Sequence, residues 1–161
     1  MNKSYRNTSE IAEYAKSIGG SKDIQYVARH GKAVERHTIK TLEKTCKEIS
    51  RKLKLREEEY ETAAILTMTE KEAEHIQEIM HKLGAEAHYI NRDSAQFKKG
   101  LTVTTYYLAK GLEFDQVFVV GGDRNNKCTK DINTSAQQEH YTNCMCMMHN
   151  FNWGRGFFEK T

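Results

Sequence analysis

The sequence alternates short, almost wholly apolar runs with segments whose apolar residues recur every three or four positions. Two of the apolar runs, TAAILT at 62–67 and QVFVVGG at 116–122, lack the polar alternation of a strand that faces water on one side. A strand that is apolar on both faces needs a covering layer on each side, and single helices between such strands supply those layers. The pattern therefore predicts an α/β fold with a mainly parallel sheet flanked by helices.

Capping and terminating residues predict where these elements begin and end. Thr69 and Glu72 have the spacing of a capping box, and Gly84 is placed to end the helix that they begin. The remaining predicted elements are an N-terminal helix that stops at Gly19-Gly20, a short strand or hairpin around Gly31, a helix from Ile39, and strands at 62–67, 86–91, 101–107 and 116–122.

Polar residues gather where the strand LTVTTYY at 101–107 gives way to QVFVVGG. Lys110, Gly111 and Glu113 stand between these two strands. Ligands of open α/β sheets bind in the crevice beyond the carboxyl ends of the strands. We therefore expect the Lys110-Gly111 junction to face that crevice.

Length and composition limit the class of protein. A chain of 161 residues is long enough for one domain with a substantial core, and no internal repeat or linker interrupts residues 1–161. No apolar run approaches the roughly 18 residues of a membrane span. The net charge is +3, and the four cysteines have no spacing that requires disulfides. These features favour a reduced, cytoplasmic protein without a membrane anchor.

The helix predicted from Ile39 carries many basic residues on its polar faces. Such a face could follow the phosphates of a nucleic acid. It could equally be a solvated helix whose charge is balanced by the Glu57–Glu59 run and Glu61 that follow, and mixed charge favours this second interpretation. The basic residues are Lys40, Lys44, Lys47, Arg51, Lys52, Lys54 and Arg56.

Four blocks of the sequence carry a family resemblance. They are NKSYRNTSEIAEYA at 2–15, AAILTMTEKEAEHI at 63–76, TTYYLAKGLEFDQVFVVGG at 104–122 and EHYTNCMCMMHNF at 139–151. In this order they resemble the fourth motif, the following strand and helix, the fifth motif and the helical sixth motif of UvrD/Rep/PcrA-type superfamily-one DNA helicases. The wording YLAKGLEFD is closest to the helicase IV (HelD-like) branch. The resemblance implies that residues 1–161 are the second, C-terminal RecA-like domain of a longer helicase, a three-layer α/β domain.

The resemblance also implies residues that bind nucleotide. Arg6 resembles the catalytic arginine that reaches the γ-phosphate across the cleft, and Tyr5 the aromatic residue that packs on adenine. Gly111 would let the backbone approach the nucleotide, Glu113 would accept a hydrogen bond from the ribose, and Lys110 would add positive charge beside them. Without the resemblance, Tyr5 would be read as a core residue and Arg6 as a surface arginine.

The same comparison implies residues that bind DNA and a partner for the ATP site. Thr104, Thr105 and Tyr107 occupy the side that faces single-stranded DNA in relatives. The chain has no G-x-x-x-x-G-K-[ST] motif, so it would supply half of an ATP site. The first RecA-like domain of the parent chain would bring the P-loop and Mg²⁺. ATP hydrolysis is then expected only in the parent protein, and the isolated domain should be inactive.

The sixth block departs from the family pattern. Cys146 stands where the resemblance implies a second arginine finger, which in phosphoryl transfer is worth about 10³ to 10⁵ in rate. The alternative is therefore a catalytically degenerate domain that docks DNA or a protein partner such as RNA polymerase. A zinc site is a further alternative, although the spacing is unlike that of known knuckles. Its ligands would come from Cys128, His140, Cys144, Cys146 and His149.

Overall fold

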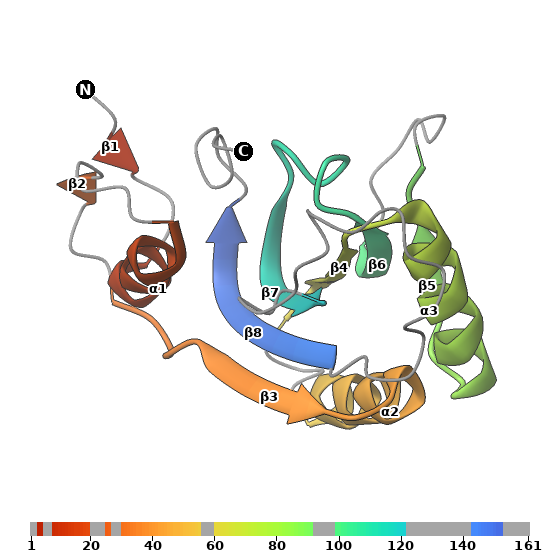
Figure 1. Ribbon diagram of the computed structural model, residues 1–161. Helices are drawn as coiled ribbons and strands as arrows, with labels where there is room; N and C mark the ends of the chain where they lie inside the picture. The colour runs from red at the N-terminus through yellow and green to blue at the C-terminus, as the bar shows by residue number, and fades with distance from the viewer. Residues whose placement is uncertain are drawn as a thin grey trace, which may run out of the picture.

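The computed structural model describes residues 3–4, 8–19, 25–26, 30–55, 60–91, 99–121 and 143–152. These residues form a six-stranded sheet in the order β3-β8-β7-β4-β6-β5, shown in Figure 1. The four strands β7, β4, β6 and β5 are parallel, and β8 and β3 continue the sheet in antiparallel pairing. The strands are β3 Glu35–Ile39, β4 Thr62–Thr67, β5 Ala87–Tyr89, β6 Gly100–Thr105, β7 Glu113–Val120 and β8 Asn143–Asn152.

The strand β4 is the centre of the parallel part of the sheet, and its side chains are buried on both faces. It pairs with β6 on one side and β7 on the other, and Ala63 to Thr67 are all buried. Odd-numbered Ile65 packs with α2 (Leu42–Lys54) and α3 (Glu70–Lys82) on one face. Even-numbered Ala64 and Leu66 pack with α1 (Ser9–Gly19) on the other.

Helices on both faces make the domain three layers deep. Figure 1 shows α2 and α3 side by side and α1 apart from them. The layer that holds α1 also contains the connection 106–112, because Ala109 is buried in the same cluster as Ile11 and Leu66. The predicted α/β fold, with a mainly parallel sheet flanked by helices, is therefore confirmed.

The helix ends follow the predicted capping chemistry. The side chain of Thr69 accepts a hydrogen bond from the backbone N–H of Glu72, and the Glu72 carboxylate accepts one from the backbone N–H of Thr69. Gly84 follows α3 with φ +77°, a left-handed conformation that glycine adopts without strain. Thr41 caps α2, so this helix begins at Leu42 and Ile39 belongs to β3.

The predicted hairpin around Gly31 is wrong. The two strands of that region lie in different sheets: β2 (Gln25–Tyr26) pairs in parallel with β1 (Lys3–Ser4), and β3 pairs with β8. The alternating residues did mark strands, but the partner of each lies elsewhere in the chain. Gly31 instead lies in a segment packed on the start of α1, where a Cβ would come within 2.5 Å of Thr8 Cγ2.

The Glu10 carboxylate joins α1 to this segment. It lies 3.1 Å from Nδ1 of His30 and accepts a hydrogen bond of 2.9 Å from the backbone N–H of Gly31. Hydrogen bonds from its own backbone N–H, from His30 and from Gly31 lower the pKa of Glu10 from 4.5 to about 2. The ionised carboxylate therefore helps to hold the segment on the helix.

Replacing Glu10 with glutamine should change how stability depends on pH. A carboxyl group whose pKa is lower in the folded state stabilises fully above pH 4.5, and this contribution disappears as the pH falls toward 2. Glu10→Gln should therefore lower the urea midpoint at neutral pH and make little difference near pH 2. A gap between the two proteins that stays constant over this pH range would contradict the assignment.

Candidate functional site

The strand register places the predicted site residues at two ends of the sheet. Thr105 pairs with Thr67, the last residue of β4, so it lies at the carboxyl end. Gln116 pairs with Ala63, near the start of β4, so Glu113 lies beyond the amino end. The length of β6 separates these ends by on the order of 15–20 Å, at about 3.3 Å per residue.

An exposed aromatic pair marks the carboxyl end. The rings of Tyr106 and Tyr107 are stacked with their centroids 4.0 Å apart and tilted by 31°. The side chain of Tyr107 is 67% exposed, and Met68, which follows the adjacent strand β4, is 48% exposed. Both side chains are exposed at the ends of adjacent strands, so this surface is a candidate for contact with a ligand.

Tyr106, the less exposed ring of the pair, is a neutral phenol at physiological pH. Partial burial and then the hydrogen bond with Tyr107 raise the pKa of Tyr106 to about 12. Its backbone N–H donates to the carbonyl of Thr67 at 3.1 Å, which fixes Tyr106 to the end of β4. Tyr106 was not among the predicted site residues, although the neighbouring tyrosines of TTYY were a visible signal.

The two threonines predicted to contact DNA are buried. Thr104 is fully buried, and its hydroxyl donates a 2.8 Å hydrogen bond to the backbone carbonyl of Ile90. Thr105 is 3% exposed. Both threonine side chains are therefore buried in the interior of the fold. Of the three residues implied for DNA contact, only Tyr107 is exposed.

The connection from β6 to β7 crosses the α1 face of the sheet. It begins with one helical turn, in which the N–H groups of Leu108 and Ala109 both donate to the carbonyl of Thr105. Ala109 is fully buried. The connection ends at Glu113, beyond the amino end of β4, so it leads away from the carboxyl end of the sheet. That the Lys110-Gly111 junction faces the carboxyl-end crevice stays a prediction.

Gly111 and Glu113 form the exposed far end of this connection. Gly111 has φ +90°, and a Cβ built on it would meet nothing within 4 Å. A side chain is thus disfavoured by the backbone conformation, while the space above the residue is open. Lys110 and Glu113 are exposed on either side of it. An open backbone beside a carboxylate suits a ligand that bears hydroxyl groups.

Two of the proposed nucleotide contacts, Tyr5 and Arg6, lie outside the described residues, so their positions relative to Glu113 stay a prediction. Of the proposed zinc ligands, Cys128 and His140 also lie outside them. Among the side chains that the structure describes, no group of three or more His, Cys, Asp or Glu could hold a metal ion.

The sixth block forms a strand and not the helix that the resemblance implied. Residues Asn143–Asn152 make up β8, between β3 and β7. The backbone of Cys146 lies opposite Arg36 on one side and Val119 on the other. The helical prediction is therefore wrong for Asn143–Asn152.

Comparison with known proteins gave no support from outside the chain. No model of a known protein family matches it, and no curated protein sequence matches it. Within the described residues, no helix is long and apolar enough to cross a membrane. The likeness to helicases therefore rests on the motifs themselves.

Proposed function

We propose that the chain is the second RecA-like domain of an ATP-dependent superfamily-one DNA helicase in the cytoplasm. In this role it contributes one wall of an ATP cleft and part of the track for single-stranded DNA. The observation that carries the proposal is the exposed Tyr107 ring, which contacts the Tyr106 ring at the carboxyl end of β6, while Met68 is exposed at the carboxyl end of the adjacent strand β4.

This aromatic surface suits unpaired bases. Every base has a π-face, so an exposed ring binds single strands with little sequence preference, and stacking is worth about 1–3 kcal/mol per base. The bases of a duplex already stack on one another and do not offer that face. Met68, exposed where the adjacent strand β4 ends, would add a soft, adaptable apolar contact.

The other end of the connection suits part of a nucleotide site. Gly111 has open space above its backbone, and the exposed carboxylate of Glu113 can accept a hydrogen bond from a ribose hydroxyl. Arg6 and Tyr5 complete this half-site in the proposal, and the first RecA-like domain adds the P-loop and Mg²⁺. ATP would supply the free energy for movement along DNA, and only the joined domains would hydrolyse it.

Replacing Tyr107 with alanine should weaken binding to single-stranded DNA. The loss of one stacked base predicts an affinity lower by about 5- to 150-fold, whereas Tyr107→Phe should bind nearly as well as the natural chain. Fluorescence anisotropy with a labelled oligothymidylate measures the difference. Equal binding by the alanine variant would show that the exposed ring does not contact DNA.

One observation favours a docking module as a second candidate function. The sixth block has Cys146 where the family pattern has an arginine finger, and it forms the strand β8, so this wall of the cleft would lack that finger. A degenerate domain could still bind DNA or a protein such as RNA polymerase. ATP turnover by the parent chain that disappears in Arg6→Ala would decide against this candidate.

A further inference from the structure

The outward side of α2 carries an uninterrupted row of basic residues. The helix buries Thr45, Cys46, Ile49 and Ser50 against the sheet. Residues three and four apart lie on one side of a helix, and the row opposite the buried side consists of positions 44, 47, 51 and 54. All four positions are exposed, and they hold Lys44, Lys47, Arg51 and Lys54. We call this row the α2 ridge.

The neighbouring helix shows that this pattern does not follow from exposure alone. The corresponding outward row of α3 mixes the two signs of charge, with Lys71 and Lys82 at its ends and Glu74 and Glu78 between them. Both helices cover the same face of the sheet and share one hydrophobic cluster. Opposite charges within a row weaken its attraction for an anion, so the like-signed α2 ridge is the better candidate of the two for an anionic partner.

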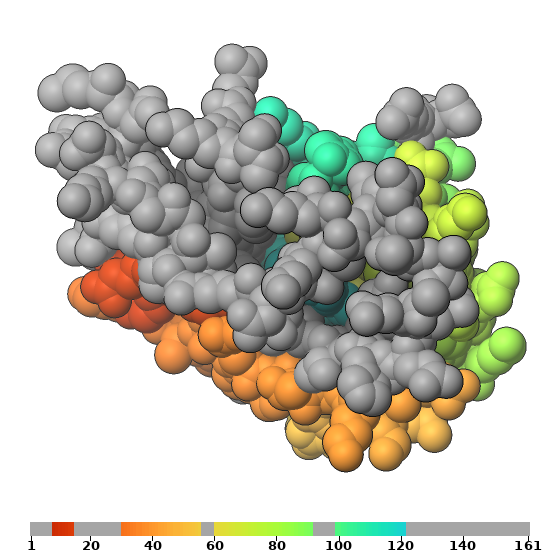
Figure 2. Space-filling view, viewed as in Figure 1, coloured from red at the N-terminus to blue at the C-terminus, as the bar shows by residue number. Residues whose placement is uncertain are grey.

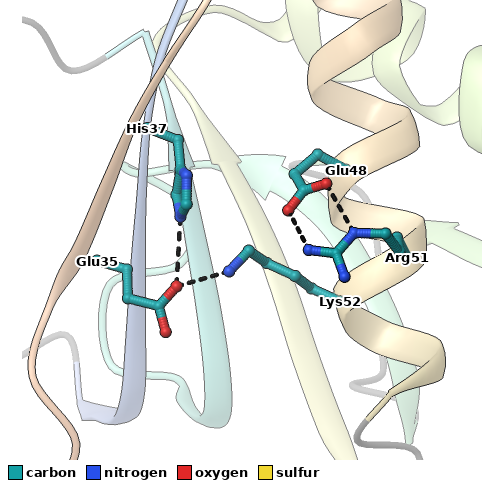
Figure 3. A network of polar contacts seen from close by, with 5 residues as sticks. All are labelled: Glu35, His37, Glu48, Arg51 and Lys52. Atoms are coloured by element: carbon teal, nitrogen blue, oxygen red, sulfur yellow. Dashed lines mark hydrogen bonds and ion pairs between the residues drawn. The ribbon is translucent and has the colours of Figure 1, made fainter.

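Two cations of α2 are already paired, as Figure 3 shows. The Arg51 guanidinium donates to both oxygens of Glu48, at 2.6 and 2.9 Å, and lowers the pKa of that carboxyl group. Lys52 lies beside the ridge, is 12% exposed and reaches Glu35 of β3 at 2.6 Å. The Lys52–Glu35 pair joins α2 to the edge strand β3, and the Arg51–Glu48 pair lies within the helix itself. Neither cation can bind a partner without breaking its contact.

Three lysines of the ridge have no such partner in the part of the chain that the structure describes. Within the described residues, no carboxylate bonds to Lys44, Lys47 or Lys54. The Glu57–Glu59 run that could balance them lies outside those residues. Figure 2 shows α2, in orange to yellow-orange, exposed along the lower edge of the molecule.

We propose that the α2 ridge binds the phosphate backbone of duplex nucleic acid. From Lys44 to Lys54 the ridge is about 15 Å long, at 1.5 Å per residue. A duplex carries one negative charge per about 1.7 Å of its axis, so each ammonium group on the ridge meets phosphates. The ridge has no aromatic residue that could stack on an unpaired base, which favours a duplex over a single strand.

This surface is separate from the aromatic pair at the carboxyl end of the sheet. The helix α2 covers the face opposite to α1 and the connection that follows Tyr107. Binding at the ridge is electrostatic and needs neither ATP nor Tyr107. The two proposals can therefore fail independently.

The test compares two double variants that remove the same charge from neighbouring helices. Lys44→Gln with Lys47→Gln changes the ridge, and Lys71→Gln with Lys82→Gln is the matched control on α3. Binding of the full chain to a labelled duplex of about 20 base pairs is followed by anisotropy from about 50 to 200 mM NaCl. The ridge variant should bind at least about tenfold more weakly at low salt, with a salt slope shallower by about 2.

The control variant should stay within about twofold of the natural chain and keep its salt slope. Lys44→Arg with Lys47→Arg should restore binding, because the charge is kept. Equal losses in both glutamine variants would show that only net charge matters and would overturn the proposal. So would binding of poly-L-glutamate as tight as that of the duplex, since the ridge would then fit an acidic protein. Tyr107→Ala should leave the duplex salt slope unchanged.

Discussion

Phe118→Ala should lower the free energy of unfolding by about 3–5 kcal/mol, the cost of removing a large, fully buried ring from a close-packed core. Phe118 lies in β7 opposite Ile65 of β4, and both belong to the cluster that α2 and α3 form against the sheet. The cavity left by the ring would therefore weaken the packing of both helices on the sheet at once.

The conservative variant Phe118→Leu keeps most of the buried volume and should cost about 1 kcal/mol. Urea unfolding followed by far-ultraviolet circular dichroism gives both values, provided that the denaturant slope stays the same. A cost below about 1 kcal/mol for the alanine variant would mean that the core can collapse into the gap or that β7 does not hold this register.

Local chemistry made the parallel part of the fold predictable. The run TAAILT forms β4 with the predicted bounds, because a short run of apolar or small residues suits a strand covered on both sides. The capping box and Gly84 set the ends of α3 for equally local reasons. None of these features depends on which distant segment pairs with which.

Long-range pairing was not predictable from the sequence. The strand β3 pairs with β8, more than a hundred residues later, and nothing in the residues of 25–39 distinguishes that partner from a hairpin. The run NCMCMMHNFN is similarly ambiguous, because Cys and Met fit a helix or a strand and form no clear period. There the family resemblance favoured a helix, and the structure has a strand.

Only part of the candidate site was predictable from the sequence, because the two threonines predicted to contact DNA are buried. The motif drew attention to Tyr107, Gly111 and Glu113, and all of them are exposed. It could not show that the connection crosses the sheet and carries Glu113 to the amino end, since this depends on the register of β7 against β4. In the proposed function, DNA therefore contacts one end of the sheet and the nucleotide contacts the other end.

The separation of the two proposed contacts depends on how β7 is aligned with β4. The side chain of Asp115 helps to hold this alignment. One oxygen of its carboxylate accepts hydrogen bonds from the N–H groups of Glu61 and Thr62 and from the Thr62 hydroxyl, at 3.1, 2.9 and 2.8 Å. The backbone N–H of Asp115 in turn donates to the Thr62 hydroxyl at 3.0 Å. The contact is reciprocal and joins the amino ends of the two strands.

Asp115→Ala should therefore lower the free energy of unfolding by about 2–3 kcal/mol, because several donors lose a charged acceptor at once. Thr62→Val keeps the shape of the side chain and should cost less, and Asp115→Asn should fall between the two. If the pair acts as one unit, the double variant Asp115→Ala with Thr62→Val should cost clearly less than the sum of the single changes. Strictly additive costs would show that Asp115 and Thr62 act independently and do not form one unit that joins β7 to β4.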